Sequence, residues 1–213
     1  MKKERYTVEK GLKYFSREEV ARLVKACEKD KRKYARRNEA LIKLSLYCGL
    51  RVSEVGLIKR EDFNMSFWKI YCRRLKGSYS NTLRIVDNHI FPRTQPALRK
   101  YIHRLDAEHN SSPYLFSSAK GNPISRQQLD LIMKDYCQKA GIQDTGKWHF
   151  HTLKHTCGVI LAESGLDIKE IQYWLGHKKV DNTLIYFQFT TLQQERMFQK
   201  LAKFAHQKEG FYL

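Results

Sequence analysis

A chain of 213 residues with 42% hydrophobic content is long enough for one sizeable core, and the length favours a single domain. Forty lysines and arginines against 22 acidic residues give a formal net charge of +18, which attracts polyanions, so nucleic acid is the first partner to consider. A basic charge that serves only solubility, a ribosomal role and a membrane-surface role are the alternatives. No apolar run reaches the roughly 18 residues that span a bilayer, and the start lacks the apolar stretch of a signal peptide. We therefore expect a soluble, cytoplasmic protein with no membrane partner.

Several chemistries are disfavoured by missing motifs. The chain has no GxGxxG or GxxxxGK[ST] phosphate loop, no HExxH zinc helix and no GxSxG elbow, so no nucleotide cofactor is indicated. The five cysteines are widely spaced and form no CxxC pair, which points to reduced thiols packed as small hydrophobic groups. We expect neither a disulfide framework nor a metal site, and no cofactor.

The first half of the chain predicts helices followed by a hairpin. Residues 1–15 are basic and aperiodic, as in a tail or linker, and SREE from Ser16 onward matches a capping box that begins a helix. A second helix is predicted over residues 38–47 and ends at Gly49, and Arg51 lies on the turn into a short helix over residues 52–58. Residues 67–86 are rich in aromatic and β-branched side chains around a Gly-Ser-Tyr-Ser-Asn turn, which predicts a β-hairpin.

Helical periodicity dominates the second half. Helices are predicted over residues 95–105, from Ser125 to a C-terminal cap at Gly141, and over 151–164, 168–175 and 181–187. A last amphipathic stretch covers residues 192–204. The predicted class is mostly α with a small antiparallel β-sheet or hairpin (α+β).

Cationic and hydrogen-bonding residues stand at the ends of these elements, followed by a tyrosine: Arg51, Lys76, His151, Lys154, His177 and Tyr186. Arginine, lysine and histidine without a carboxylate pair suit a phosphate-like transition state, because each donor stabilises charge on the non-bridging oxygens. His151 and Lys154 are three residues apart, so they share one face of a helix whose first turn also offers free backbone N–H groups.

Four motifs together carry a family resemblance. GLRVSE around Arg51, RLKGS in the hairpin, HTLKHT with DIKEIQYWLGH, and NTLIYF resemble the catalytic domain of the tyrosine recombinases, the phage integrase family. The register also agrees: 26 residues separate His151 from His177, and nine separate His177 from Tyr186. The resemblance extends from about residue 16 to residue 187, most of the chain.

The resemblance implies a phosphoryl transfer that uses no metal. Tyr186 would be the nucleophile that attacks the scissile phosphate of duplex DNA, leaving a 3′-phosphotyrosyl enzyme and a free 5′-hydroxyl. Lys76, at a hairpin tip that can enter the minor groove, would protonate the leaving 5′-oxygen.

The same resemblance assigns the phosphate site. Arg51 and Lys154 would bind the non-bridging oxygens, His177 would hydrogen-bond the phosphate, and His151 would assist proton transfer at the tyrosine. The family has arginine where this chain has Lys154, and lysine is a point charge without the bidentate geometry of guanidinium. We hypothesise that Lys154 is a functional variant, so that Lys154→Arg retains or raises cleavage.

Other residues nearby receive different expectations. Arg73, Arg74 and Arg84, in the hairpin, are further candidates for DNA contacts. His155 is expected to be structural, and Tyr173 is expected to pack in the core.

The resemblance also implies a division of the chain into segments and a set of partners. We expect a tail or linker over residues 1–15, a catalytic domain over 16–189, and a C-terminal helix or tail over 190–213. Within the family such a C-terminal segment docks on a neighbouring protomer, and packing on its own domain is the alternative. Larger members carry an N-terminal domain that completes a clamp on DNA. This chain is therefore expected to be either an excised catalytic domain or a short recombinase like those that invert fimbrial promoters, with salt-sensitive DNA binding.

Taken together, the sequence predicts a site-specific recombinase that binds double-stranded DNA. It is expected to be a homotetramer in a synaptic complex on DNA and a monomer or weak oligomer when free. Two other functions remain open at this point: a DNA-binding regulator of the same fold that does not cut, and a type IB topoisomerase-like enzyme that relaxes DNA.

Overall fold

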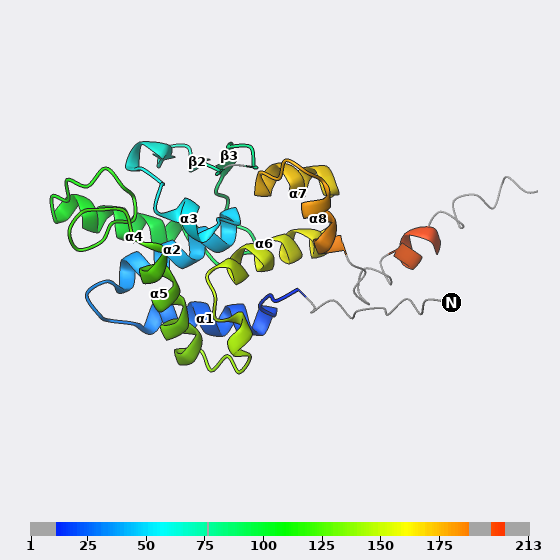
Figure 1. Cartoon of the computed structure of the whole chain (residues 1–213), viewed down its shortest axis with the longest axis horizontal. Coiled ribbons are helices and arrows are strands. Elements are labelled where there is room, and N and C mark those ends of the chain that lie inside the picture. The colour runs from blue at the N-terminus through cyan, green and yellow to red at the C-terminus, as the bar shows by residue number, and fades with distance from the viewer. Residues whose placement is uncertain (1–11, 76, 188–196, 203–213) are drawn as a thin grey trace, which may run out of the picture.

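The computed structural model describes residues 12–75, 77–187 and 197–202. Helix α2 lies in the middle of the body and packs against α1, α4 and α6 (Figure 1). The remaining helices surround it, and a small sheet covers one side. The helices are α1 Arg17–Lys29, α2 Ala35–Cys48, α3 Val52–Val55, α4 Thr94–Ala107, α5 Arg126–Lys139, α6 His151–Glu163, α7 Ile168–Leu175 and α8 Asp181–Leu184.

Helix α1 begins as its sequence predicts. The Ser16 hydroxyl accepts a hydrogen bond from the Glu19 amide, and the Glu19 carboxylate accepts one from the Ser16 amide, so the capping box is complete. Packing starts slightly earlier than the helix, because Phe15 is 2% exposed and its amide donates to the Thr156 hydroxyl of α6. The last residues of the expected tail are therefore attached to the body.

The sheet is antiparallel and has three strands in the order β1-β2-β3: β1 Phe63–Asn64, β2 Lys69–Cys72 and β3 Asn81–Arg84. The predicted hairpin is β2 and β3, and β1 is an addition that the sequence did not indicate. Ile70 pairs with Leu83 on the buried face, and Lys69 pairs with Arg84 on the exposed face. This alternation follows from the period of two along a strand.

The C-terminal third supplies three short helices that fold back on α6. Helix α7 ends at Gly176, whose φ of 66° is left-handed, and α8 is followed by the 3-10 helix Ile185–Phe187. In Figure 1, α7 and α8 lie beside α6 at the same end of the body. The predicted elements over residues 151–187 are therefore confirmed, and the mostly helical class with a small antiparallel sheet is confirmed with them.

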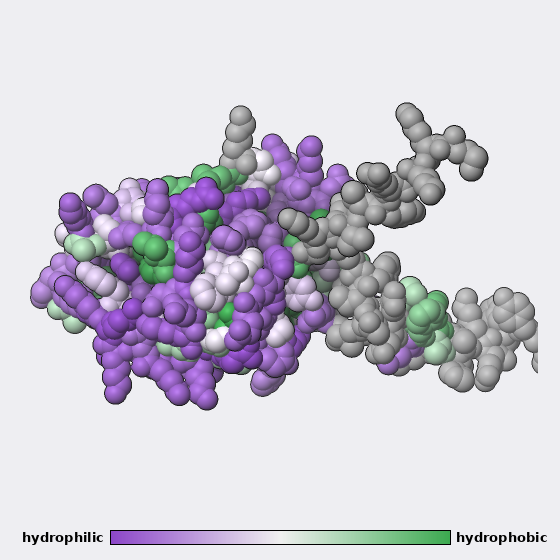
Figure 2. Space-filling view, turned by 60° about the horizontal axis from the view of Figure 1, so that its bottom comes forward, coloured by the Kyte–Doolittle hydropathy of each residue, from purple (hydrophilic) through white to green (hydrophobic). Residues whose placement is uncertain are grey.

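Figure 2 shows a face of the body that is mainly hydrophilic, with small and scattered hydrophobic patches. Within the described residues, no helix has the length and apolar character needed to cross a bilayer. All five cysteines are buried free thiols, as expected from their apolar neighbours.

Candidate active site

Three elements meet at Gly49, which ends α2. Its φ of 59° is left-handed, and a Cβ there would lie 2.3 Å from Leu175 Cδ2 and 3.2 Å from Cys157 Sγ. Only glycine fits both the conformation and the space. The end of α2 is thereby brought against α6 and the end of α7, and Arg51 emerges from this junction.

Arg51 is held by Glu54. The Glu54 carboxylate accepts a 2.9 Å hydrogen bond from the Arg51 backbone amide and a 2.8 Å ion pair from its guanidinium, whose Nη1 also donates to the Ser78 hydroxyl. Glu54 is fully buried, and burial alone would raise its pKa. The Arg74 charge and the hydrogen bonds from Arg51 instead lower the pKa of Glu54, so the carboxylate is ionised. Arg51 keeps 27% of its side chain exposed, which leaves it accessible to an anion.

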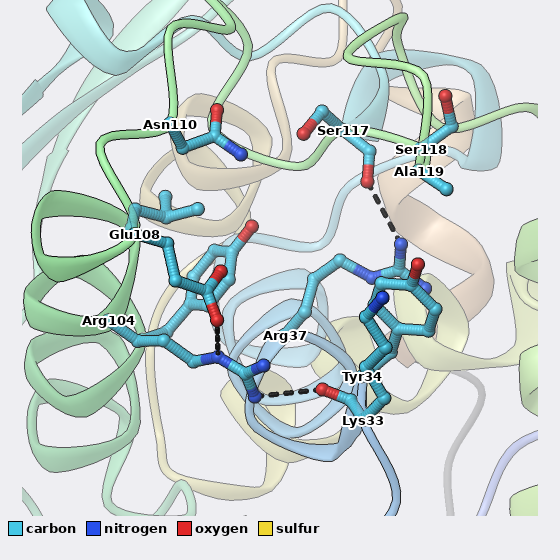
Figure 3. A pocket seen from close by; sticks show the side chains of 11 residues that line it. Lys33, Tyr34, Arg37, Arg104, Glu108, Asn110, Ser117, Ser118 and Ala119 are labelled. Carbon is cyan, nitrogen blue, oxygen red and sulfur yellow. Dashed lines mark hydrogen bonds and ion pairs between the residues drawn. The ribbon is translucent and has the colours of Figure 1, made fainter.

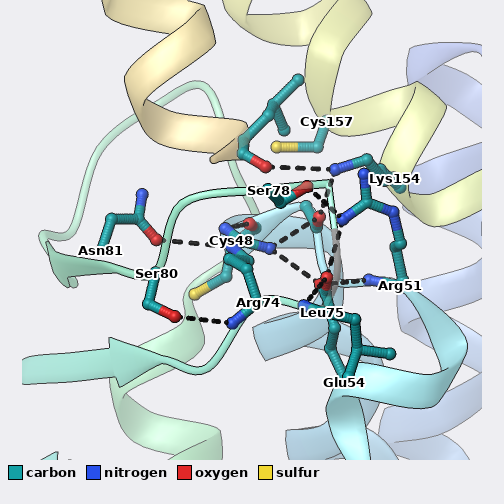
Figure 4. A network of polar contacts seen from close by, with 12 residues as sticks. Cys48, Arg51, Glu54, Arg74, Leu75, Ser78, Ser80, Asn81, Lys154 and Cys157 are labelled. Atoms are coloured by element: carbon teal, nitrogen blue, oxygen red, sulfur yellow. Dashed lines mark hydrogen bonds and ion pairs between the residues drawn. The ribbon is translucent and has the colours of Figure 1, made fainter. Parts of the chain in front are cut away.

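Lys154, on α6, reaches the end of α2 two residues before Arg51. It is 2% exposed, and its ammonium donates to the carbonyl oxygens of Gly49 and Leu175, each at 3.3 Å (Figure 4). Desolvation, followed by the charges of Arg74 and Arg51, lowers the pKa of Lys154 to about 7. An ammonium has three N–H donors, so one donor stays available beyond these two carbonyls.

Arg74 does not contact solvent, which corrects its expected role in DNA binding. Its side chain is 0% exposed and pairs with Glu54 at 3.1 Å. Its guanidinium also donates to the carbonyls of Cys48 and Gly49 (Figure 4) and to that of Trp174. A guanidinium with this many internal acceptors ties the hairpin to the ends of α2 and α7. Arg74 is therefore a structural arginine of the site.

His177 follows the end of α7 and is 3% exposed. Its Nδ1 lies 3.0 Å from the Thr183 hydroxyl of α8, and Gly176, just before it, accepts a 2.9 Å hydrogen bond from the Tyr79 amide of the hairpin. Desolvation and then the Lys154 charge lower the pKa of His177 to about 3, so its imidazole is neutral at physiological pH.

Tyr186 lies against His177 and His155 and is 4% exposed. Its ring is nearly parallel to that of His177, with centroids 6.3 Å apart and planes at 13°. Its hydroxyl lies 3.3 Å from His155 Nδ1. Burial raises the pKa of Tyr186, so the phenol is protonated in this state.

His151 is the first residue of α6 and is exposed. Its ring meets His155 edge to face, with centroids 4.5 Å apart. Desolvation, followed by the charges of Lys154 and Arg51, lowers the pKa of His151. The structure thus gathers Arg51, His151, Lys154, His177 and Tyr186 around the first two turns of α6.

The remaining residues singled out in the sequence lie outside this cluster or outside the described part of the chain. Lys76 lies outside the described residues. Arg84 is exposed on β3, whereas Arg73 forms a two-pronged pair with Asp62, with Nη2 to Oδ1 at 2.8 Å. Tyr173 is 60% exposed and donates to the Thr82 carbonyl, so the expectation that it packs in the core is wrong. It lies on the outer side of α7, where it reaches over the sheet.

Within the residues that the structure describes, no three His, Cys, Asp or Glu side chains are grouped so as to hold a metal ion. A separate recess lies at the opposite end of α2 from Gly49 (Figure 3). Its two arginines make internal contacts: Arg37 donates to the Ser117 carbonyl, and Arg104 pairs with Glu108. None of the predicted site residues lines it.

The fold and this cluster define the class: the chain has the catalytic-domain architecture of a tyrosine recombinase. Among solved structures, the crystal structure of XerA recombinase superimposes with a TM-score of 0.74 at 27% identity, covering 88% of this chain and 64% of that one. XerH site-specific recombinase, bound to palindromic difH substrate in a post-cleavage complex, gives a TM-score of 0.70 at 19% identity over 90% of this chain and 53% of that one, a likeness of fold alone.

Sequence comparison then gives the family. The phage integrase family model matches residues 13–192, and the chain belongs to that family. The type 1 fimbriae regulatory protein FimB of Escherichia coli (strain K12) is 32% identical over 174 residues, covering 81% of this chain and 82% of FimB. The tyrosine recombinase XerA of Pyrococcus furiosus is 34% identical over 182 residues, covering 84% of this chain and 58% of XerA. The resemblance found in the sequence is confirmed, and the chain spans less than two thirds of XerA.

Two residues of the site were not predicted from the sequence. Glu54 stands three positions after Arg51, at the spacing of a capping box, and that signal was available in RVSE. His155 stands four positions after His151 and so shares its helix face, which was a reason to place it in the same cluster.

Proposed function

We propose that this chain is a site-specific recombinase that cuts and rejoins duplex DNA through Tyr186. The phenolic oxygen attacks the scissile phosphorus and loses its proton with the assistance of His151. The bond from phosphorus to the 5′-oxygen breaks, and the leaving oxygen takes a proton from Lys76. Attack by the 5′-hydroxyl of a partner strand reverses these steps. The phosphotyrosyl bond stores the energy of the phosphodiester, so no nucleotide is required.

The observation that carries this proposal is the placement of Tyr186 beside a cationic phosphate site. Arg51, with its guanidinium oriented by buried Glu54, and Lys154 supply positive charge where charge develops on the non-bridging oxygens. His177 is neutral and fixed by Thr183, so it can serve as a hydrogen-bond donor to the same phosphate.

The outer face of the sheet supports DNA as the partner. Lys69 and Arg84 are directly opposite each other on β2 and β3, and both are exposed. Like charges at such a cross-strand position destabilise a sheet, and a polyphosphate backbone would relieve the repulsion.

The test is covalent capture of the protein on DNA. Suicide duplexes that cover the DNA flanking the coding gene are incubated with the wild-type protein and with Tyr186→Phe, then run on a denaturing gel. We expect a protein–DNA adduct with wild type and none with Tyr186→Phe, while both bind the duplex in a native gel.

A second candidate function is a regulator that binds DNA without cutting it. It is favoured by the lysine at 154 and by the internal carbonyls that occupy two of its donors. Native-gel binding by the wild-type protein without any adduct would support this function in place of recombination.

A further inference from the structure

One face of α6 carries two residues that touch the nucleophile. His155 Nδ1 lies 3.3 Å from the Tyr186 hydroxyl, and the two ring centroids are 6.1 Å apart. Gly158, three residues further along the same helix face, lies under the ring of Tyr186. Both contacts are made to the Tyr186 of the same chain.

Gly158 leaves the space that the ring occupies. A Cβ at this position would lie 2.6 Å from each of three ring atoms of Tyr186: Cε1, Cε2 and Cζ. These are the atoms next to the hydroxyl, so even an alanine would displace the reacting end of the side chain. Glycine is a poor helix former, and its presence inside α6 matches the need for this space.

The protonation states make the contact at His155 a directed hydrogen bond. Desolvation, followed by the charges of His151 and Lys154, lowers the pKa of His155 to about 4, so the ring is neutral at physiological pH. Burial raises the pKa of Tyr186, so its hydroxyl keeps a proton to donate. With the Nε2–H tautomer of His155, Nδ1 is the acceptor.

We propose that His155 and Gly158 form a cradle that positions Tyr186 for attack, with His155 accepting the hydroxyl hydrogen bond and Gly158 admitting the ring. The hydrogen bond fixes the direction of the O–H and, with it, the orientation of the phenolic oxygen toward the phosphorus. His155 is thus a positioning residue for the nucleophile, and the role rests on the proposed recombinase function. Misplacing a reacting atom by about 1 Å can lower a rate roughly 100-fold.

The first test compares two substitutions at His155. His155→Asn places an amide oxygen near the position of Nδ1 and keeps an acceptor, whereas His155→Leu removes it. We expect adduct formation on a suicide duplex to stay within about threefold of wild type for His155→Asn and to fall about 10- to 100-fold for His155→Leu, with unchanged melting temperature and duplex affinity. Equal rates for His155→Leu and wild type would overturn the proposal, and so would equally low rates for both variants.

The second test uses Gly158→Ala. Alanine favours a helix over glycine, so a simple helix position would gain stability from this change. We expect Gly158→Ala to lose adduct formation at least tenfold without binding the duplex more weakly. Wild-type rates for this variant would overturn the role of the space under the ring.

A third experiment distinguishes a defect in attack by Tyr186 from a defect in protonation of the leaving group. In a duplex whose scissile 5′-oxygen is replaced by sulfur, the leaving thiolate needs no proton. This substrate should restore cleavage by Lys76→Ala and leave the His155→Leu defect in place. Rescue of His155→Leu by this substrate would contradict the proposal.

If the wild-type protein forms no adduct at all, the recombinase function itself fails. If a Tyr186-dependent adduct forms and is insensitive to His155 and Gly158, the cradle alone fails.

Discussion

Lys154 occupies the position at which the family resemblance leads us to expect an arginine. The lysine ammonium is buried against two helix-end carbonyls, and desolvation, followed by the charges of Arg74 and Arg51, lowers its pKa to about 7. An arginine at this position would keep its charge at any physiological pH. A lysine at this position therefore makes the charge of the proposed phosphate site depend on pH.

A pH profile checks this directly. The lysine must be protonated to bind phosphate, so the second-order rate of adduct formation at subsaturating DNA should fall as pH rises through about 7, approaching a tenfold loss per pH unit. Lys154→Arg should abolish this fall in rate above pH 7 and should keep or raise the rate at pH 8. Parallel profiles for the two proteins would show that Lys154 does not titrate in this range, and loss of the adduct in Lys154→Arg would refute the functional equivalence of the two residues.

At the scale of elements, the candidate active site depends on how helix ends meet. The turn at Gly49 lets α2 end against α6 and α7, and Arg74 links the hairpin to the same ends. Glu54 joins Arg51 and Arg74 from α3. Turns and buried polar contacts thus position the catalytic candidates, and the residues that make these contacts form no sequence motif that would identify them.

Gly49→Ala tests this junction. A left-handed alanine costs about 1–2 kcal/mol, and the overlap with Leu175 adds roughly 1–3 kcal/mol. We expect the melting temperature to fall by roughly 5–15 °C. Gly141→Ala is the matched control, since its φ is 63° and a Cβ there would meet nothing within 4 Å. Equal losses for the two variants would show that backbone strain alone matters at Gly49.

At the scale of the whole molecule, the C-terminal residues 197–202 form a helical segment with exposed apolar side chains. Met197, Phe198 and Leu201 are 39%, 63% and 58% exposed, respectively. The greater part of residues 190–213 lies outside the described residues, so docking of this segment on a neighbouring protomer is still a prediction. Exposed apolar groups collected on one short helix favour it over packing on the same domain.

Substitution of the apolar side chains distinguishes the two alternatives. Phe198→Ser combined with Leu201→Ser should reduce the mass of the complex on target DNA from that of the expected tetramer to that of smaller species and leave the melting temperature of the free protein unchanged. Leu131→Ser, at a position 65% exposed on α5, serves as the control for loss of surface hydrophobicity. A lowered melting temperature with an unchanged complex would instead place the segment on its own domain.

The sequence by itself determined the local structure and the family. Periodicity, the capping box at Ser16 and the glycines at 49 and 176 predicted the helices and their ends, because these signals act through contacts between near neighbours. The four motifs in the right order and spacing predicted the fold and the recombinase class before any tertiary contact was known.

Only the tertiary structure decided which of the basic and aromatic residues face solvent and which support the site. Arg73 and Arg74 are adjacent in sequence, yet the first is on the surface and the second is buried on Glu54. Tyr173 is exposed, whereas Tyr186 and its partner His155 come together across 31 positions. Such contacts depend on the packing of α6, α7 and the hairpin against each other, and long-range packing is not encoded in any local pattern of residues.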